Sequence, residues 1–244
     1  MAVKIGHASI DEHGKGRGGN AGDQTGREVY IREYYIHPSK WDIVLRPKKA
    51  SVAEASAKAC EAGCANDNIG YDMDQRNTAH TQAKAVKYNL SKIKTKCETD
   101  CSAFMTLCAL AAGVTSLEYT GNAPTTSTMR SAFSKSGAYE VLDDKKYLTS
   151  DAYLKRGDIL VSEGHHTVMV LSNGSKVENK STINNFKGKV TADSLNIRKG
   201  PGTNYAIVGT LKNGTACTIV ETKGTWGKLK NNKGWVSLNY IKKI

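Results

Sequence analysis

Cys101 stands between an acid and a serine in the stretch "ETDCSAFMTLC", residues 98–108. The apolar run that follows ends at Gly113 and predicts a helix that begins at about Asp100. A helix N-terminus presents unpaired backbone N–H groups and the positive end of the helix dipole, both of which stabilise a thiolate. Cys101 is therefore a candidate nucleophile, and its pKa is expected to be lowered.

Thiol catalysis also needs a general base, usually a histidine, and a polar group that orients it. The chain offers six histidines: His7, His13, His37, His80, His165 and His166. Only the last two head a predicted strand in the same domain. The two-residue period of a strand places His165 and His166 on opposite faces, so one of them can face the helix of Cys101.

Two other interpretations of Cys101 stay open at this point. A free cysteine is commonly a small buried hydrophobe. Alternatively, the two Cys-x-x-x-Cys pairs, Cys60 with Cys64 and Cys97 with Cys101, suggest a zinc site. Structural zinc sites more often have two intervening residues, so zinc is the less favoured alternative. The helix position alone favours a buried hydrophobe over a nucleophile, and a nucleophile would need no metal or other cofactor.

The elements that position these residues follow from pattern. Helices are predicted over 51–62, where Ser51 and Glu54 form a capping box, and over 75–90, 100–113 and 126–135. Strands are predicted over 27–36, 157–163 and 166–174, with an Asn-Gly turn leading into a hairpin partner at 175–179. Helices followed by an antiparallel sheet indicate an α+β domain.

The pattern of residues changes after a polar segment at 173–190. Short alternating runs broken by turn residues predict five or so strands in 187–244, the pattern of a small β-barrel. This region holds 11 Lys or Arg against 2 acids, and thus +9 of the net charge of +12. Such a positive charge favours binding of a polyanionic partner, such as an anionic cell-wall polymer. Nucleic acid is disfavoured because no basic recognition helix accompanies it.

No signal peptide and no membrane-spanning apolar run is visible, so we expect a soluble protein made in the cytoplasm, with its six cysteines reduced. Membrane insertion is not expected, and the chain is expected to be a monomer.

Three segments in order, "TDCSAFM", "LKRGDILV" and "HHTVMVLSNG", resemble the papain-like NlpC/P60 peptidases and the neighbouring CHAP amidohydrolases. The resemblance implies a papain-like α+β fold with Cys101 as nucleophile. It selects His166 over His165, because Asn173 follows His166 by the seven residues usual in the family. It places the orienting residue at Glu178, with Asn179 adjacent.

The resemblance also implies substrate-binding residues. Asp100 and Ser102 flank the nucleophile, where they would contact a substrate amine or carboxylate. The opening stretch "IGHASIDEHGKGRGGNAGDQTGREV" is similar to the N-terminal region of phage endolysins, and it suggests Asp23 and Gln24 as groove residues.

The C-terminal region resembles a bacterial SH3 domain through "LNIRKGPGTNY", "VGTLKNGT" and "GWVSLNYI". Such domains bind peptidoglycan or its attached polymers. Tyr205, Trp226 and Tyr240 are candidate wall-binding aromatics, whereas Trp235 is expected in the barrel core. The predicted domains are 1–183 and 187–244.

These resemblances together imply a phage endolysin that cleaves an amide or peptide bond of peptidoglycan and acts at the cell wall after release from the host cytoplasm. The bond itself stays open between the N-acetylmuramoyl-L-alanine amide, the γ-D-glutamyl bond and cross-bridge peptides. The alternative is a non-catalytic wall-binding protein with a degenerate hydrolase domain.

Overall fold

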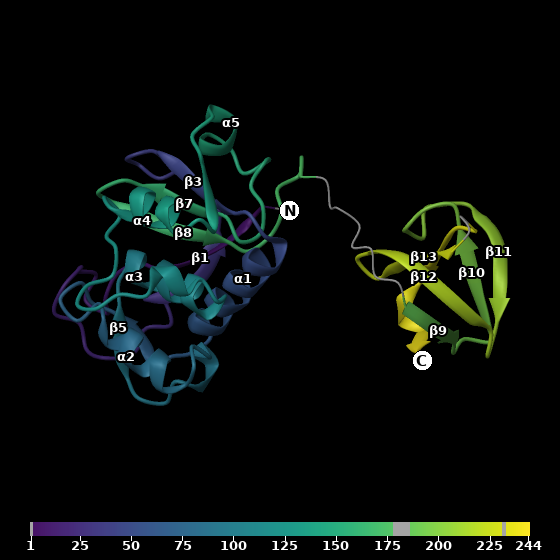
Figure 1. The fold of residues 1–244 in the computed structure, drawn as a ribbon, viewed down its shortest axis with the longest axis horizontal. Coiled ribbons are helices and arrows are strands. Elements are labelled where there is room, and N and C mark those ends of the chain that lie inside the picture. The colour runs from purple at the N-terminus through teal and green to yellow at the C-terminus, as the bar shows by residue number, and fades with distance from the viewer. Residues whose placement is uncertain (1, 178–185, 231–232) are drawn as a thin grey trace. The chain divides into compact units, whose positions relative to one another are not determined.

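The computed structural model describes residues 2–177, 186–230 and 233–244 (Figure 1). The chain divides into two compact units, Met1–Val177 and Glu178–Ile244. Each unit has a hydrophobic core of its own. No helix in the described part of the chain is long and apolar enough to cross a membrane.

The first unit is built on a six-stranded sheet in the order β2-β1-β8-β7-β3-β6, with every neighbouring pair antiparallel. Its strands are β1 (Lys4–Ala8), β2 (Val29–Glu33), β3 (Ile43–Pro47), β6 (Tyr139–Leu142), β7 (Ile159–Ser162) and β8 (His166–Val170). A separate parallel pair joins β4 (Ile69–Tyr71) and β5 (Cys97–Thr99).

Helices cover this sheet on both faces (Figure 1). They are α1 (Ala50–Cys64), α2 (Thr78–Ala85), α3 (Cys101–Ala111), α4 (Met129–Lys135) and α5 (Lys145–Leu148), with 3-10 turns at Leu90–Lys92 and Thr115–Leu117. The apolar helix α3 packs against α1 and β8 in the larger core. The smaller core, around Trp41, Ile5 and Val168, lies on the opposite face. The predicted mixture of helix and sheet is confirmed.

Several helix boundaries differ from prediction, with α2 beginning at Thr78 and α4 at Met129, each three residues later than expected. Helix α1 has Lys49 at its N-cap with no side-chain cap hydrogen bond, so Ser51 and Glu54 lie inside the helix and the predicted capping box is wrong. Helix α2 ends at Ala85 instead of continuing to residue 90. Lys87 and Tyr88 take positive φ values of 53° and 58°, a conformation that a right-handed helix cannot continue through.

The predicted hairpin after β8 is not formed by the described residues, and positions 178–179 of its predicted second strand lie outside them. Residues 171–177 form bends and turns, and the strand that pairs with the outer side of β8 is β1. The pairing brings the start of the chain against its 166–170 segment. Gly6 permits this arrangement, because a Cβ at that position would lie 2.5 Å from the Cys60 sulfur of α1.

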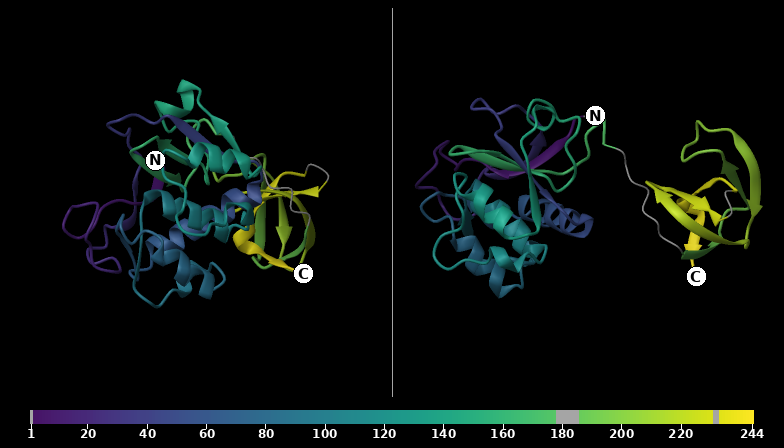
Figure 2. Two further views of the ribbon diagram at one scale, coloured as in Figure 1. Left: turned by 60° about the vertical axis from the view of Figure 1, so that its left-hand side comes forward. Right: turned by 45° about the horizontal axis from the view of Figure 1, so that its top comes forward.

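The second unit is all β, as predicted. Figure 2 shows this unit from two further sides. Its described residues form seven strands, more than the five or so predicted, in the order β11-β10-β14-β13-β12-β9-β15. They are β9 (Phe186–Val190), β10 (Ser194–Arg198), β11 (Ile207–Lys212), β12 (Ala216–Lys223), β13 (Trp226–Leu229), β14 (Trp235–Ser237) and β15 (Ile241–Lys243), with a 3-10 turn at Leu238–Tyr240. Trp235 is buried, as its place in the pattern predicted.

Candidate functional site

The start of α3 is organised by Asp100. This residue is the N-cap, and its carboxylate accepts a hydrogen bond from the backbone N–H of Ala103 at 2.7 Å. A side-chain cap satisfies one of the donors that a helix leaves unpaired. The helix predicted from the sequence is thereby confirmed, with Cys101 as its first residue and only 7% exposed.

Arg76 holds this helix start from the loop that precedes α2. Its guanidinium donates to both Asp100 oxygens, at 2.6 and 3.1 Å, and to the Ser102 hydroxyl at 2.8 Å. The carbonyls of Ala123 and Pro124 accept from the same group. Asp100 and Ser102 are buried and paired with Arg76, so in this conformation they position the helix start. Their contact with substrate stays a prediction.

The Cys101 thiol lies against backbone donors. The N–H groups of Ser102 and Thr167 favour its thiolate, as does the charge of Arg76. Burial, followed by the neighbouring Asp100 carboxylate, outweighs them and raises the pKa of Cys101 to about 12. The lowered pKa expected from the helix terminus is therefore not found, and the resting thiol is neutral.

Thr167 is available to Cys101 because two strands part at this point. Antiparallel pairing between β1 and β8 is present at Ile5 with Val170 and at Gly6 with Met169, and it stops there. Alternate N–H groups of β8 point toward β1, and that of Leu171 donates to Lys4. The N–H groups of Met169 and Thr167 point to the same side as that of Leu171. Because the pairing with β1 ends at Met169, the Thr167 N–H has no β1 partner, and it interacts with the Cys101 thiol instead.

His166 lies beside Thr167 and is hydrogen-bonded to a second histidine. Its Nε2 is 2.9 Å from Nδ1 of His7, which comes from β1. Burial lowers the pKa of His166 to about 4 and that of His7 to about 3, so both rings are neutral at pH 7. After burial, the His166 ring further lowers the pKa of His7, and the His37 ring further lowers that of His166. In this conformation the recorded hydrogen bond of the His166 ring goes to His7 and not to Cys101.

His7 was missed by the sequence prediction, which placed the orienting residue at Glu178 or Asn179. Both of those residues lie outside the described part of the chain. The alternation in "VKIGHAS", with Val3, Ile5 and His7 on one face, was the available signal for a strand that carries a histidine. Its pairing with a strand some 160 positions later has no local signature.

A second segment missed by the prediction borders the histidines. His37 lies in the loop between β2 and β3, and its ring is stacked on His166 with centroids 5.9 Å apart. Tyr35, in the same loop, lies 6.5 Å from the His7 ring, and the Cys101 charge contributes to raising the Tyr35 pKa. This loop therefore forms one wall of the candidate site.

Asp23 and Gln24, predicted groove residues, instead fold their own loop. The Asp23 carboxylate accepts from the backbone N–H groups of Thr25, Gly26, Glu28 and Val29. Gln24 donates through Nε2 to the carbonyls of Ala21 and Gly22. Within the described residues, neither side chain forms a hydrogen bond or an ion pair with Cys101 or His166. Their role in a substrate groove stays a prediction.

The four cysteines of the zinc alternative do not gather. Cys60 interacts with Cys64 and with Cys108 of α3, whereas the Cys97 thiol donates to the Asn68 carbonyl. Among the described residues, no group of three or more His, Cys, Asp or Glu side chains is arranged to hold a metal ion.

The proposed wall-binding aromatics of the second unit differ in exposure. Tyr205 and Tyr240 are 43% and 50% exposed, and Trp226 is half-buried. Exposed aromatic rings suit contact with sugars or peptides.

A family model described as an endolysin-like domain matches residues 5–177, which is most of the chain and nearly all of the first unit. The chain belongs to this family. A second model, described as a bacterial SH3 domain, matches residues 193–242 within the all-β unit. An endolysin-like domain joined to a bacterial SH3 domain indicates a hydrolase that acts on the peptidoglycan of the cell wall. No curated protein and no solved structure matches the chain.

Proposed function

We propose that this endolysin-like protein cleaves an amide or peptide bond of peptidoglycan by a cysteine mechanism of the papain-like, NlpC/P60 type. Cys101 is the nucleophile, His166 the general base and His7 the residue that orients His166. The observation that carries the proposal is the meeting of α3, β8 and β1 at one place, with the Cys101 thiol against Thr167 and His166 bonded to His7.

The tautomers follow from the direction of proton transfer. His166 can accept a proton at Nδ1 only if its resting proton is on Nε2, from which it donates to Nδ1 of His7. His7 then carries its own proton on Nε2, a buried atom that has no hydrogen-bond partner among the described residues. His7 thus fixes the tautomer and ring orientation of His166 without taking a charge itself.

The reaction begins as the Cys101 proton moves to Nδ1 of His166 and the sulfur bonds to the substrate carbonyl carbon. The resulting oxyanion is stabilised by backbone N–H groups at the start of α3, including that of Cys101. His166 then gives its proton to the leaving nitrogen, and the carbon–nitrogen bond breaks to leave a thioester. Water, deprotonated by His166, hydrolyses the thioester and restores the thiol.

The neutral thiol has a consequence for the chemistry. Because the resting pKa values of Cys101 and His166 are about 12 and about 4, the neutral pair is favoured over the thiolate–imidazolium pair. Proton transfer therefore accompanies sulfur attack, after the His166 ring approaches the thiol.

Replacement of Cys101 tests the proposal. We expect Cys101→Ala to reduce release of soluble fragments from purified Gram-positive walls by at least about 1,000-fold, the scale seen when a nucleophile is removed. Cys217→Ala, which removes a partly buried thiol of the second unit, should keep activity. Full lysis by Cys101→Ala would exclude the mechanism. Mass spectrometry of the new termini would then identify the bond: a free lactyl carboxylate with a free alanine amine for an amidase, or cut stem or bridge peptides for an endopeptidase.

A further inference from the structure

The second unit contains a groove that the catalytic mechanism does not use. Its volume is about 440 Å³, and the residues that line it are Lys199, Val208, Lys228, Lys233, Gly234 and Trp235. Three of the six carry an ammonium group. The groove therefore differs in chemistry from an aromatic sugar-stacking site.

The floor of the groove is rigidly built. Trp235 is only 8% exposed and pairs across the sheet with Lys228 on one side and Arg198 on the other. Gly234 has a φ of +118°, and a Cβ there would lie 2.6 Å from the Arg198 carbonyl oxygen. A glycine is thus required where the chain passes close to β10.

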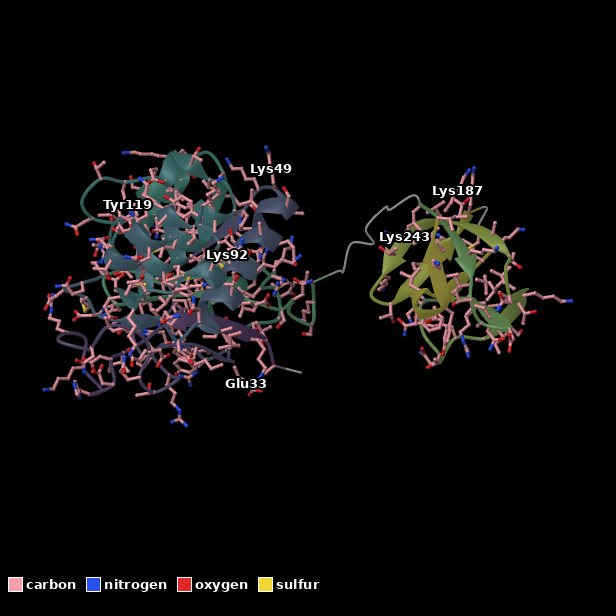
Figure 3. All side chains as sticks on the ribbon, turned by 90° about the horizontal axis from the view of Figure 1, so that it is seen from below. Glu33, Lys49, Lys92, Tyr119, Lys187 and Lys243 are labelled. Atoms are coloured by element: carbon pink, nitrogen blue, oxygen red, sulfur yellow. The ribbon has the colours of Figure 1, made fainter. Side chains whose placement is uncertain are left out.

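The charges at the rim are incompletely neutralised. Lys228 forms an ion pair with Glu221 at 3.4 Å. Lys199 and Lys233 are exposed, and no ion pair is recorded for either within the described residues. The surrounding unit strengthens their field, since residues 187–244 carry 11 basic side chains against 2 acidic ones. Lys187 and Lys243 are among the basic side chains seen on this unit (Figure 3).

We propose that this groove binds a wall polymer that carries phosphodiester groups, in addition to any contact that the unit makes with peptidoglycan. The three lysines match an anion with repeated negative charge, because each can donate to a different phosphate oxygen. Trp235 is too buried to offer a ring face to a neutral sugar. Exposed Val208, 49% accessible, provides apolar contact for the carbon backbone of such a polymer. The inference rests on the proposed function, since it concerns how the enzyme is held on its substrate.

Wall binding by the full chain tests the inference. The Cys101→Ala protein serves as parent so that walls are not digested, and bound protein is measured by co-sedimentation with purified Gram-positive walls. One portion of the walls is first extracted with hydrofluoric acid, which removes phosphodiester-linked polymers. We expect extraction to weaken binding of the parent about tenfold.

The double variant Lys199→Ala/Lys233→Ala should bind intact walls about tenfold more weakly than the parent and should lose little more on extracted walls. Lys212→Ala/Lys223→Ala removes two exposed charges from the same unit outside the groove, and it should bind nearly as the parent does. Lys199→Arg/Lys233→Arg should retain binding. Thermal unfolding of each variant should match that of the parent, because the changed side chains are exposed.

Two results would overturn the inference: equal binding of the parent to intact and extracted walls, or equal losses in the groove and control variants. The first result would show that peptidoglycan itself is the ligand. The second would show that wall binding depends on the net charge of the unit and not on the groove. Failure of the catalytic proposal would be seen separately. The Lys199/Lys233 variant with Cys101 intact should cleave soluble muropeptides at the rate of the unmodified protein, whichever polymer holds the enzyme on the wall.

Discussion

The pair of histidines determines how the candidate site should respond to pH. His166 must be neutral to act as a base, and burial lowers its pKa to about 4 from an ordinary value of 6.5. We therefore expect kcat/KM on a soluble muropeptide to stay level from pH 7 down to about pH 5 and to fall only near pH 4. A fall centred near pH 6.5, with stability unchanged there, would contradict a lowered pKa of His166.

His7 should act through His166, not on the substrate. We expect His7→Ala to lower kcat about 100-fold with little change in KM, because His166 loses the acceptor that fixes its tautomer. His7→Gln offers a side-chain oxygen as acceptor and should recover part of the loss. Steady-state kinetics on a soluble muropeptide, with circular dichroism to confirm folding, provides the measurement. A His7→Ala enzyme with normal kcat would assign His7 a packing role.

Residue types at the site were partly predictable from sequence. Cys101 at a helix start and His166 at a strand start each follow from local pattern, and the structure confirms both positions. The pKa of Cys101 was not predictable, because the burial that raises it depends on β8 and the loop before α2. Nor was His7, whose role depends on the pairing of β1 with β8.

At the scale of elements, the buried ion pair between Arg76 and Asp100 joins the loop before α2 to the start of α3. We expect Arg76→Ala to lower the free energy of unfolding by about 3–5 kcal/mol, because Asp100 would be left buried without its partner. Arg130→Ala breaks a half-exposed pair with Glu163 and should cost about 0–1 kcal/mol. Urea unfolding of the two variants measures both values. Similar small losses would show that Arg76 does not hold α3.

The strand that leads into α3 carries a second buried group, Glu98. It is 2% exposed, and no hydrogen bond within geometric limits reaches either carboxylate oxygen from the described residues. Burial, followed by the charges of Glu28, Asp72 and Glu12, raises the pKa of Glu98 to about 8 from 4.5. Between pH 4.5 and about 8, Glu98 is therefore protonated in the folded chain and ionised in the unfolded chain.

Because the folded-state pKa is the higher one, the stability that Glu98 contributes is complete below about pH 4.5 and is lost as pH rises toward 8. We expect Glu98→Gln, which cannot ionise, to flatten the decline in unfolding temperature between pH 5 and 8. Glu33→Gln, at an exposed ion pair with Lys4, should leave the slope unchanged. An unaltered slope in Glu98→Gln would show that Glu98 is ionised throughout.

At the scale of the whole molecule, the hydrophobic periodicity of the sequence was enough to predict a mixed unit followed by an all-β unit, because helix and strand periods are local properties. The order of strands in the first sheet could not be predicted from periodicity, because it depends on contacts between distant segments. The predicted partner of β8 was the segment that follows it in sequence, which is the usual preference of antiparallel strands. The structure uses the N-terminal strand instead, since Ile5 shares an apolar face with Val168 and Val170.

The two units should also be separable in experiment, because their cores share no residues. We expect a chain that ends at residue 177 to fold, with an unfolding temperature close to that of the corresponding transition in the full chain. It should cleave soluble muropeptides at an unchanged rate, since Cys101, His166 and His7 all lie within it. On intact walls its rate should fall about 10- to 100-fold, because attachment by the second unit raises the local concentration of enzyme at its substrate. Calorimetry of the full chain should resolve two transitions. Loss of soluble-substrate activity in the shortened chain would instead mean that residues 178–244 contribute to the catalytic site.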